Sequence, residues 1–201
     1  MDVKLIPLIE LPTFKYPELE AIEDSKKKQE ELIKNNYSSV IKLASYNNSF
    51  YNLTDVSLED LEKAIKLHVS DMEFEKSCAL FGGYALKVNA NIVLYPQCCG
   101  LLSEINDWKK ILKEDFQPFY LTECHPSPKF TKTGNSLIIE CDSSEEPFQP
   151  KTESKITLPY KTAVQAIENV IEELNKVSKK LDLLNSTFKT QSVSKQLIWE
   201  E

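Results

Sequence analysis

The 201-residue chain contains no arginine, so all 24 of its basic residues are lysine. Arginine supplies the planar, bidentate fork that recognises phosphates, carboxylates and guanine edges, so its absence disfavours a dedicated nucleic-acid-binding protein. The 31 acidic residues give a net charge of -7, and such a surface is repelled by a phosphate backbone. We therefore expect no nucleic-acid partner.

Glycine and histidine are also scarce. The four glycines form neither a GxGxxG nor a GxxxxGK[ST] loop, which excludes these two nucleotide-binding motifs, and the two histidines cannot build a histidine-rich metal site. The five cysteines are odd in number, which favours free thiols in a reducing compartment over a disulfide framework. We therefore expect no cofactor.

No apolar run reaches the roughly 18 residues that a membrane span needs. The apolar start of the chain is interrupted by Pro7 and Glu10 and carries Asp2, so it lacks the pattern of an export signal. The sequence thus predicts a cytoplasmic protein with no membrane partner.

Two segments in the first part of the chain have the periodicity of helices. The lysine- and glutamate-rich segment from residue 17 to about 45 carries one apolar stripe at helical spacing. In the second segment, Ser57 and Asp60 form a capping box, and apolar residues recur on one side to about Met72. His68 lies on that side, so we expect it to be packed in the core.

The chain changes character at residue 77, where short apolar runs alternate with turn residues. This pattern is typical of β-structure, and asparagine or glycine at the expected turns tolerates the left-handed conformation of tight hairpins. Ser103 is expected to cap a short helix that ends near residue 112. The predicted hairpins are residues 84–95, turning at 89–91, and residues 129–142, turning at Gly134 and Asn135, with further strands at 119–123 and 155–158.

The strongest helical pattern comes last. Apolar residues recur at spacings of three and four from residue 159 to about 184, and Asn185 is expected to end the helix. Only about three heptads are present, which favours packing on a sheet over a coiled coil. Trp199 lies in a polar tail, residues 186–201, and we expect it to dock against the rest of the protein.

Helices first, strands in the middle and a helix at the end predict an α+β fold. We expect N-terminal helices, a central antiparallel or mixed sheet of about 4–6 strands, and a long amphipathic C-terminal helix packed on that sheet. No linker rich in glycine, serine or proline divides the chain, so residues 1–201 are predicted to be one domain. Its parts are a helical N-terminal part (1–76), a sheet-and-helix part (77–185) and the tail (186–201).

The residues that could carry chemistry are concentrated in PQCCG, which holds Cys98 and Cys99, and in ECHPSP, which holds Cys124 and His125. Three thiols and one imidazole are a formally sufficient set of zinc ligands. A zinc-binding pair usually lies two residues apart, however, whereas adjacent residues in a strand point to opposite faces. The spacing therefore predicts no bound metal.

A nucleophilic thiol, Cys98 or Cys99, with His125 as its base is the other active arrangement. The helix expected just after Cys99 favours a thiolate, because the N-terminus of a helix is partially positive. No carboxylate is recognisable as the residue that orients the histidine. The available carboxylates are Asp107, Glu123, Glu140 and Asp142, whereas Glu145 and Glu146 are expected to face solvent. We therefore expect a noncatalytic protein, with a thiol-dependent or zinc-dependent hydrolase as the alternative.

Several short motifs follow one another over about residues 80–185: GGYAL, KVNANIVLYPQCCG, a tryptophan in a short helix, HPSP, a strand and a long terminal helix. In these features the chain resembles small uncharacterised bacterial proteins, some of which are similar to the immunity proteins of polymorphic-toxin loci. The resemblance implies a noncatalytic protein that binds and neutralises a toxin. An acidic surface suits that role because immunity proteins occlude the basic active-site surface of a nuclease or similar toxin.

The excess negative charge is mostly N-terminal, where residues 1–76 hold 15 acidic and 10 basic side chains. Its densest cluster surrounds the start of the second predicted helix and consists of Asp55, Glu59, Asp60 and Glu62. Carboxylates are favourable at a helix start and can attract a basic partner. We therefore predict that this acidic cluster binds a protein partner, with a basic toxin as the specific candidate.

Overall fold

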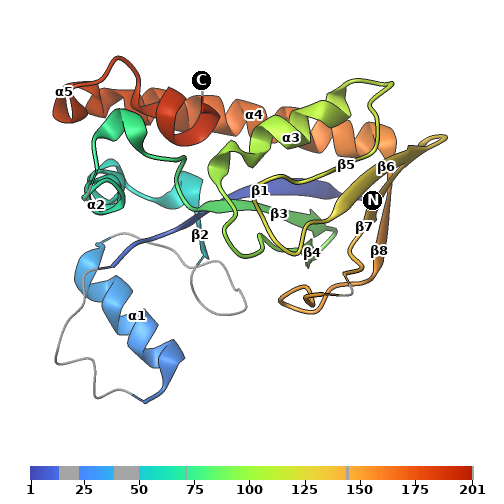
Figure 1. Cartoon of the computed structure of the whole chain (residues 1–201), viewed down its shortest axis with the longest axis horizontal. Coiled ribbons are helices and arrows are strands. Elements are labelled where there is room, and N and C mark those ends of the chain that lie inside the picture. Colours follow the sequence, from blue (N-terminus) through green and yellow to red (C-terminus); the bar gives the residue numbers. More distant parts are fainter. Residues whose placement is uncertain (14–22, 39–49, 71, 144, 201) are drawn as a thin grey trace.

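The computed structural model describes residues 1–13, 23–38, 50–70, 72–143 and 145–200. They form an α+β fold with two antiparallel sheets of four strands each (Figure 1). The predicted fold class is therefore confirmed, although the strands form two sheets and not one central sheet. The strands are β1 (Val3–Glu10), β2 (Phe50–Asn52), β3 (Gly82–Val88), β4 (Asn91–Leu94), β5 (Phe119–Tyr120), β6 (Lys129–Thr133), β7 (Ser136–Glu140) and β8 (Lys155–Pro159).

The first sheet has the strand order β2-β1-β3-β4. The apolar start of the chain, β1, lies inside this sheet and pairs with β3 from Val3–Val88 to Ile9–Gly82. β3 and β4 form the predicted hairpin, and Asn89 in its turn has a left-handed φ of 54°. The second sheet has the order β5-β6-β7-β8, and its β6–β7 hairpin turns as predicted at Gly134, where φ is 56°.

The helix predicted over residues 17–45 is confirmed in part. α1 covers Ser25–Asn36, and Ile33 is buried on one side of it. The two ends of that prediction, residues 14–22 and 39–49, lie outside the described residues.

The second predicted helix is α2 (Leu58–His68). It begins as expected, because the Ser57 hydroxyl accepts a hydrogen bond from the Asp60 N–H at 3.1 Å. It ends before Met72, and His68 is half-buried at its last position. The His68 Nε2 lies 3.0 Å from the Cys78 carbonyl oxygen, and the ring meets Phe81 edge-on. His68 is therefore not the core residue that the sequence predicted.

The short helix after the first sheet is present, but it starts differently. It consists of a 3₁₀ turn (Leu102–Glu104), α3 (Ile105–Trp108) and a second 3₁₀ turn (Lys109–Leu112). Ser103 lies inside the first turn and makes no cap; its buried hydroxyl has no hydrogen-bond partner among the described residues. The prediction of a Ser103 cap was wrong because the extended residue before the turn is Leu101.

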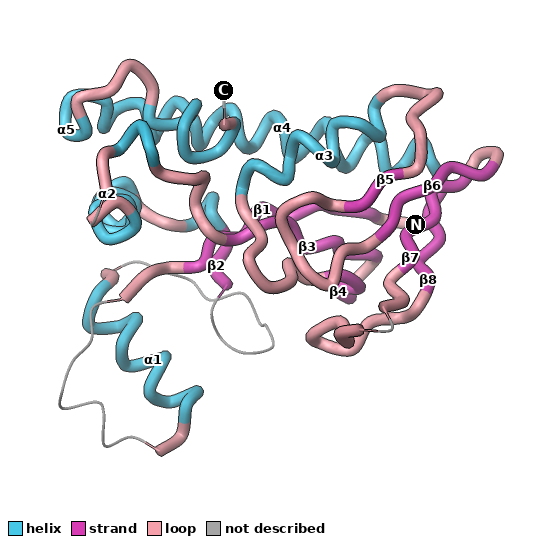
Figure 2. Tube along the Cα trace, viewed as in Figure 1, coloured by secondary structure: helices cyan, strands magenta, loops and turns pink. Residues whose placement is uncertain are grey.

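The long C-terminal helix is α4 (Tyr160–Leu181), and it packs against β1, β7 and β8 as predicted. Figure 2 shows α3 and α4 along one side of the strands. The helical path continues through a 3₁₀ turn (Asp182–Leu184) and α5 (Asn185–Phe188), so Asn185 does not end it. The left-handed residue at the end of α5 is Lys189, with φ of 54°. Asn185 instead accepts a hydrogen bond from the Val193 N–H at 2.9 Å.

The C-terminal tail is ordered around Trp199, which docks as predicted. Its indole N–H donates a hydrogen bond to the Ser178 hydroxyl of α4 at 3.0 Å, and the residue is only 9% exposed. The Leu80 N–H also donates to the Leu197 carbonyl at 3.0 Å. Buried apolar side chains consequently form one contiguous core from Val3 to Trp199. Among the described residues, no helix is both long and apolar enough to cross a membrane.

Candidate functional site

The candidate site is a cavity of about 290 Å³ formed by loops from both sheets. The first sheet contributes Glu10 at the end of β1 and residues 95–100, which follow β4. The second sheet contributes His125 and Pro126 from the β5–β6 loop and residues 146, 147, 149 and 150 from the β7–β8 loop. The cavity thus brings PQCCG and HPSP together, although about 25 residues separate them in the sequence.

The backbone of the PQCCG loop places the thiols of Cys98 and Cys99 side by side. Cys98 forms an isolated antiparallel bridge with His125, whose N–H donates to the Cys98 carbonyl at 3.1 Å. Cys99 is left-handed, with φ of 64°, a conformation that few non-glycine residues adopt. The two Sγ atoms consequently lie 3.3 Å apart, and both side chains are exposed. The expectation that the adjacent cysteines point to opposite faces was therefore wrong.

Gly100 makes this turn possible by close packing. The Gly82 N–H donates to the Gly100 carbonyl at 2.9 Å. A Cβ atom on Gly100 would lie 2.6 Å from the Gly82 carbonyl oxygen and 2.9 Å from Oε1 of Glu104. Any larger residue would therefore displace the loop that carries the thiols.

A glutamine holds the two sides of the cavity together. Gln97 is buried and its Nε2 donates to the carbonyl oxygens of Tyr95 at 2.8 Å and of Gln149 at 3.1 Å. In return, the Gln149 N–H donates to Gln97 Oε1 at 2.9 Å. These reciprocal bonds fix the β7–β8 loop against the PQCCG loop.

The β7–β8 loop supplies the carboxylate that orients the histidine. Oε2 of Glu146 lies 2.9 Å from Nδ1 of His125, so this carboxylate fixes the orientation of the ring. Glu146 is still half exposed, at 52%, but it is not the purely solvated residue that the sequence predicted. Of the expected carboxylates, Asp107 accepts hydrogen bonds from Thr122 and Glu140 pairs with Lys129, so neither faces His125.

The two thiols, the imidazole and the Glu146 carboxylate shift one another's pKa values. The hydrogen bond between the two thiols raises the pKa of Cys98 and lowers that of Cys99, and His125 lowers the pKa of Cys99 further. Glu146 first, and Cys99 second, raise the pKa of His125. The arrangement therefore favours a Cys99 thiolate beside a protonated imidazole.

Three of the four proposed metal ligands are brought together. The ligand atoms of Cys98, Cys99 and His125 all lie within 4.8 Å of one another. Cys124 is buried away from them, with its Sγ 4.0 Å from the Pro126 carbonyl, and burial strongly raises its pKa. The set that the sequence suggested is therefore reduced to two thiols and one imidazole.

A buried carboxyl group lies beneath the loop. Glu104 is 2% exposed, and its Oε1 has no hydrogen-bond partner among the described residues. Burial raises the pKa of Glu104 to about 8. The side chain fills the space next to Gly100 and Gly83, so it is neutral at neutral pH and supports the loop from inside.

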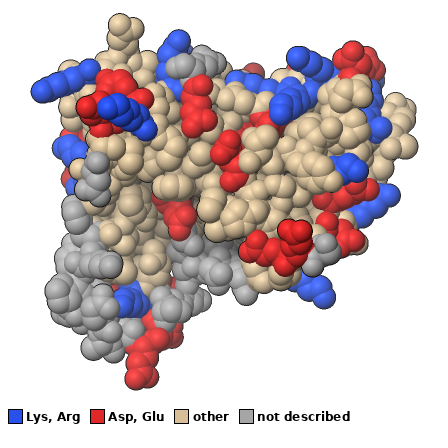
Figure 3. Space-filling model, in the orientation of Figure 1, with Lys and Arg blue, Asp and Glu red and all other residues tan. Residues whose placement is uncertain are grey.

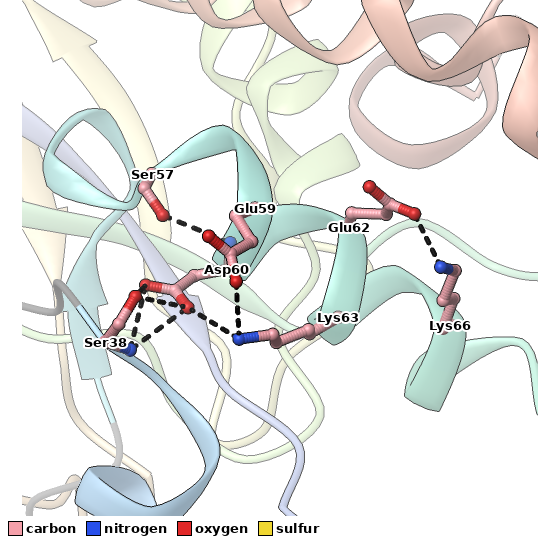
Figure 4. A network of polar contacts seen from close by, with 7 residues as sticks. All are labelled: Ser38, Ser57, Glu59, Asp60, Glu62, Lys63 and Lys66. Carbon is pink, nitrogen blue, oxygen red and sulfur yellow. Dashed lines mark hydrogen bonds and ion pairs between the residues drawn. The ribbon is translucent and has the colours of Figure 1, made fainter.

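The acidic cluster around α2 is less open than its sequence suggests (Figure 4). Asp60 is fully buried and accepts hydrogen bonds from the backbone N–H and hydroxyl of Ser38. Glu59 pairs with Lys63 at 3.0 Å, and Glu62 pairs with Lys66. The Asp60 carboxylate is therefore inaccessible to a partner, because it is buried and hydrogen-bonded inside the protein. Asp55, Glu59 and Glu62 keep surface positions.

Comparisons with protein-family models, curated proteins and solved structures found no match to this chain.

Sequence reasoning placed Cys98, Cys99 and His125 among the candidates but missed Glu146, Gln97 and the buried Glu104. Glu146 follows His125 by 21 residues in a loop, so no short-range periodicity links them. Glu104 directly follows Ser103 in a segment whose apolar residues predicted burial on one side, and this was the available signal for an interior carboxyl group.

Proposed function

We propose that the protein is a thiol-dependent enzyme in which Cys99 is the nucleophile. The observation that carries the proposal is the succession of Cys99, His125 and Glu146 at the wall of one cavity. A nucleophile, an imidazole and an orienting carboxylate are the parts that nucleophilic catalysis uses on unrelated folds. Glu146 supplies the orienting group that the sequence pattern lacked.

The reaction that these residues support is hydrolytic acyl transfer. The Cys99 thiolate attacks the acyl carbon, and the new C–S bond forms as the bond to the leaving group breaks. The His125 imidazolium gives its proton to the leaving group, and the neutral imidazole then takes a proton from the water that cleaves the thioester. Glu146 stabilises the imidazolium, and the Cys98 thiol donates a hydrogen bond to the thiolate.

The lining of the cavity favours a small neutral or cationic acyl substrate. Its carboxyl groups are Glu10 and Glu146, and the described lining holds no lysine. On the face of the molecule drawn in Figure 3, acidic side chains are grouped where the β7–β8 loop lies in Figure 1. An anionic substrate would therefore be repelled at the entrance.

The direct test is selective alkylation with iodoacetamide at neutral pH. Cleavage after lysine leaves Cys98 and Cys99 in one peptide, residues 88–109, and fragmentation of that peptide separates them. We expect Cys99 to be labelled at least about tenfold faster than the exposed Cys78, because a thiolate is the reactive form. His125→Ala and Glu146→Gln should both slow the labelling of Cys99, and hydrolysis of small neutral and cationic esters should fall with it.

The chain offers a matched control. His68 also lies beside a cysteine, with its Nε2 3.9 Å from Cys78 Sγ, but burial raises the pKa of that thiol. His68→Ala should leave the labelling of Cys99 unchanged. Equal labelling of Cys78 and Cys99, or a Cys99 rate that His125→Ala does not lower, would refute the proposal.

We propose as a second candidate a noncatalytic, cytoplasmic immunity protein of bacterial origin that binds a basic toxin. The net charge of -7 and the surface carboxylates Asp55, Glu59 and Glu62 around the start of α2 favour this function. Electrostatic attraction between complementary surfaces speeds association at low salt and weakens as ionic strength rises.

This candidate is tested by measuring association with a candidate basic toxin. Association rates are measured from low to high salt for the native protein and for a variant with Asp55→Asn, Glu59→Gln and Glu62→Gln. Slower association and a smaller salt slope in the variant are expected, and identical slopes would remove this surface. A Cys99→Ser variant separates the two functions, because it should keep toxin binding and lose thiol chemistry.

A further inference from the structure

We propose that Cys98, Cys99 and His125 form a three-ligand site for Zn²⁺, with Glu146 orienting the imidazole and the fourth coordination position facing the cavity. Zn²⁺ binds thiolate sulfur and imidazole nitrogen, and sites with three protein ligands keep one position for water or another small ligand. The consequence for activity rests on the proposed thiol function, because the metal would occupy the Cys99 nucleophile.

The ligand separations are close to those that a tetrahedral ion requires. With Zn–S bonds of about 2.3 Å, two sulfur ligands of a tetrahedral zinc lie roughly 3.8 Å apart. The two Sγ atoms are 3.3 Å apart, and all three ligand atoms lie within 4.8 Å of one another. To complete the site, the sulfurs would separate by roughly half an ångström and the most distant sulfur and imidazole nitrogen, now within 4.8 Å, would approach to roughly 3.6 Å. Both thiols are exposed, so their side chains have room for this movement.

The surroundings of the ligands also suit a cation. A metal-binding histidine commonly donates its other ring N–H to a carboxylate, and Glu146 lies 2.9 Å from Nδ1 of His125. Nε2 then serves as the metal ligand. Glu10 is a second carboxyl group in the cavity lining, and no lysine accompanies it among the described residues there. Two thiols with one imidazole favour zinc over magnesium or calcium, which prefer oxygen ligands.

Cys98 distinguishes this site from the nucleophilic one. Catalysis by Cys99 uses Cys98 only as a hydrogen-bond donor, and a serine hydroxyl can replace that donor. A metal site needs the Cys98 sulfur itself. Cys98→Ser therefore removes a metal ligand but leaves the Cys99 nucleophile in place, so that Zn²⁺ binding and Cys99 labelling can be measured separately in one variant.

The experiment is a titration of the chelator-treated, reduced protein with Zn²⁺ by calorimetry. We expect one ion per chain in the native protein. Cys98→Ser and His125→Ala should each weaken binding strongly, and Glu146→Gln should weaken it by roughly 10- to 100-fold. Cys78→Ser is the control, because this exposed thiol lies outside the three-ligand cluster. Replacement of zinc by Co²⁺ should give thiolate-to-metal charge-transfer absorption that disappears in Cys98→Ser.

Alkylation in the same samples keeps the two proposals apart. Zn²⁺ should protect Cys99 from iodoacetamide in the native protein but not in Cys98→Ser. Binding that Cys98→Ser leaves unchanged, or no stoichiometric binding at all, would overturn the metal site. Fast labelling of Cys99 without zinc binding would refute the metal site alone. Zinc binding by a protein whose metal-free Cys99 labels slowly would refute the nucleophile and retain the metal site.

Discussion

Glu104→Gln is expected to change how the stability of the protein depends on pH. Burial raises the pKa of Glu104 from 4.5 to about 8, so the native state keeps a proton that the unfolded state releases. The stabilisation from this group is complete below pH 4.5 and is lost as pH rises to about 8. Glutamine is neutral at every pH in this range and removes that dependence.

The magnitude follows from the difference between the two pKa values. A pKa difference of one unit corresponds to about 1.36 kcal/mol. Between about pH 5 and 8, ionisation of Glu104 in the unfolded chain therefore lowers the free energy of unfolding by roughly 4 kcal/mol. This is a large part of the 5 to 15 kcal/mol that is typical of natural domains. The amide that replaces the Glu104 carboxyl group would need new hydrogen-bond partners, but that cost is the same at every pH. This cost lowers the free energy of unfolding by the same amount at every pH, so it does not change the slope against pH.

The assay is urea denaturation at about one-unit intervals across this pH range, for the native protein, Glu104→Gln and a Glu153→Gln control. Glu153 is exposed, so this variant should keep the slope of the native protein. The difference between Glu104→Gln and the native protein should move in favour of the variant by roughly 4 kcal/mol as pH rises. Parallel pH profiles for these two proteins would show that Glu104 is not held protonated by burial.

Five further substitutions at four positions test the fold and the support of the site, by urea denaturation or by the rate of Cys99 alkylation. Ser57→Ala should lower the free energy of unfolding by about 1 kcal/mol, because α2 loses its N-terminal cap. Trp199→Ala should cost about 3–5 kcal/mol through the lost packing, and Trp199→Phe about 1 kcal/mol through the lost indole hydrogen bond. Gly100→Ala should cost about 1–3 kcal/mol and also slow the alkylation of Cys99, because the added Cβ displaces the loop. Gln97→Ala should slow that alkylation too, and an unchanged rate would show that the reciprocal hydrogen bonds do not position the site.

The elements that the sequence predicted well are those with short-range signals. The capping box at Ser57, the asparagine and glycine turns and the apolar stripe of α4 each act within a few residues, so local pattern is sufficient. β1 was not predicted: it contains Pro7, which is unusual in an inner strand, and its pairing with β3 joins residues far apart in the chain. The division into two sheets also depends on long-range pairing, which periodicity does not specify.

The sequence predicted Cys98, Cys99 and His125 as candidate residues, but neither the orienting Glu146 nor the geometry of the site. Alternation along a strand separates Cys98 from Cys99 only if both are extended, and the left-handed Cys99 removes that condition. Asp60 shows the reverse case. Its place at a helix start was predicted, but the Ser38 hydrogen bonds that bury its carboxylate come from a distant part of the chain.

The division into two sheets places the two halves of the site on separate supports. The thiol pair belongs to the segment that follows β4, whereas the imidazole and its carboxylate both belong to loops of the second sheet. The separation between sulfur and imidazole therefore depends on how the two sheets are positioned relative to each other. The Cys98–His125 backbone bridge and the Gln97–Gln149 hydrogen bonds are the ties that set it.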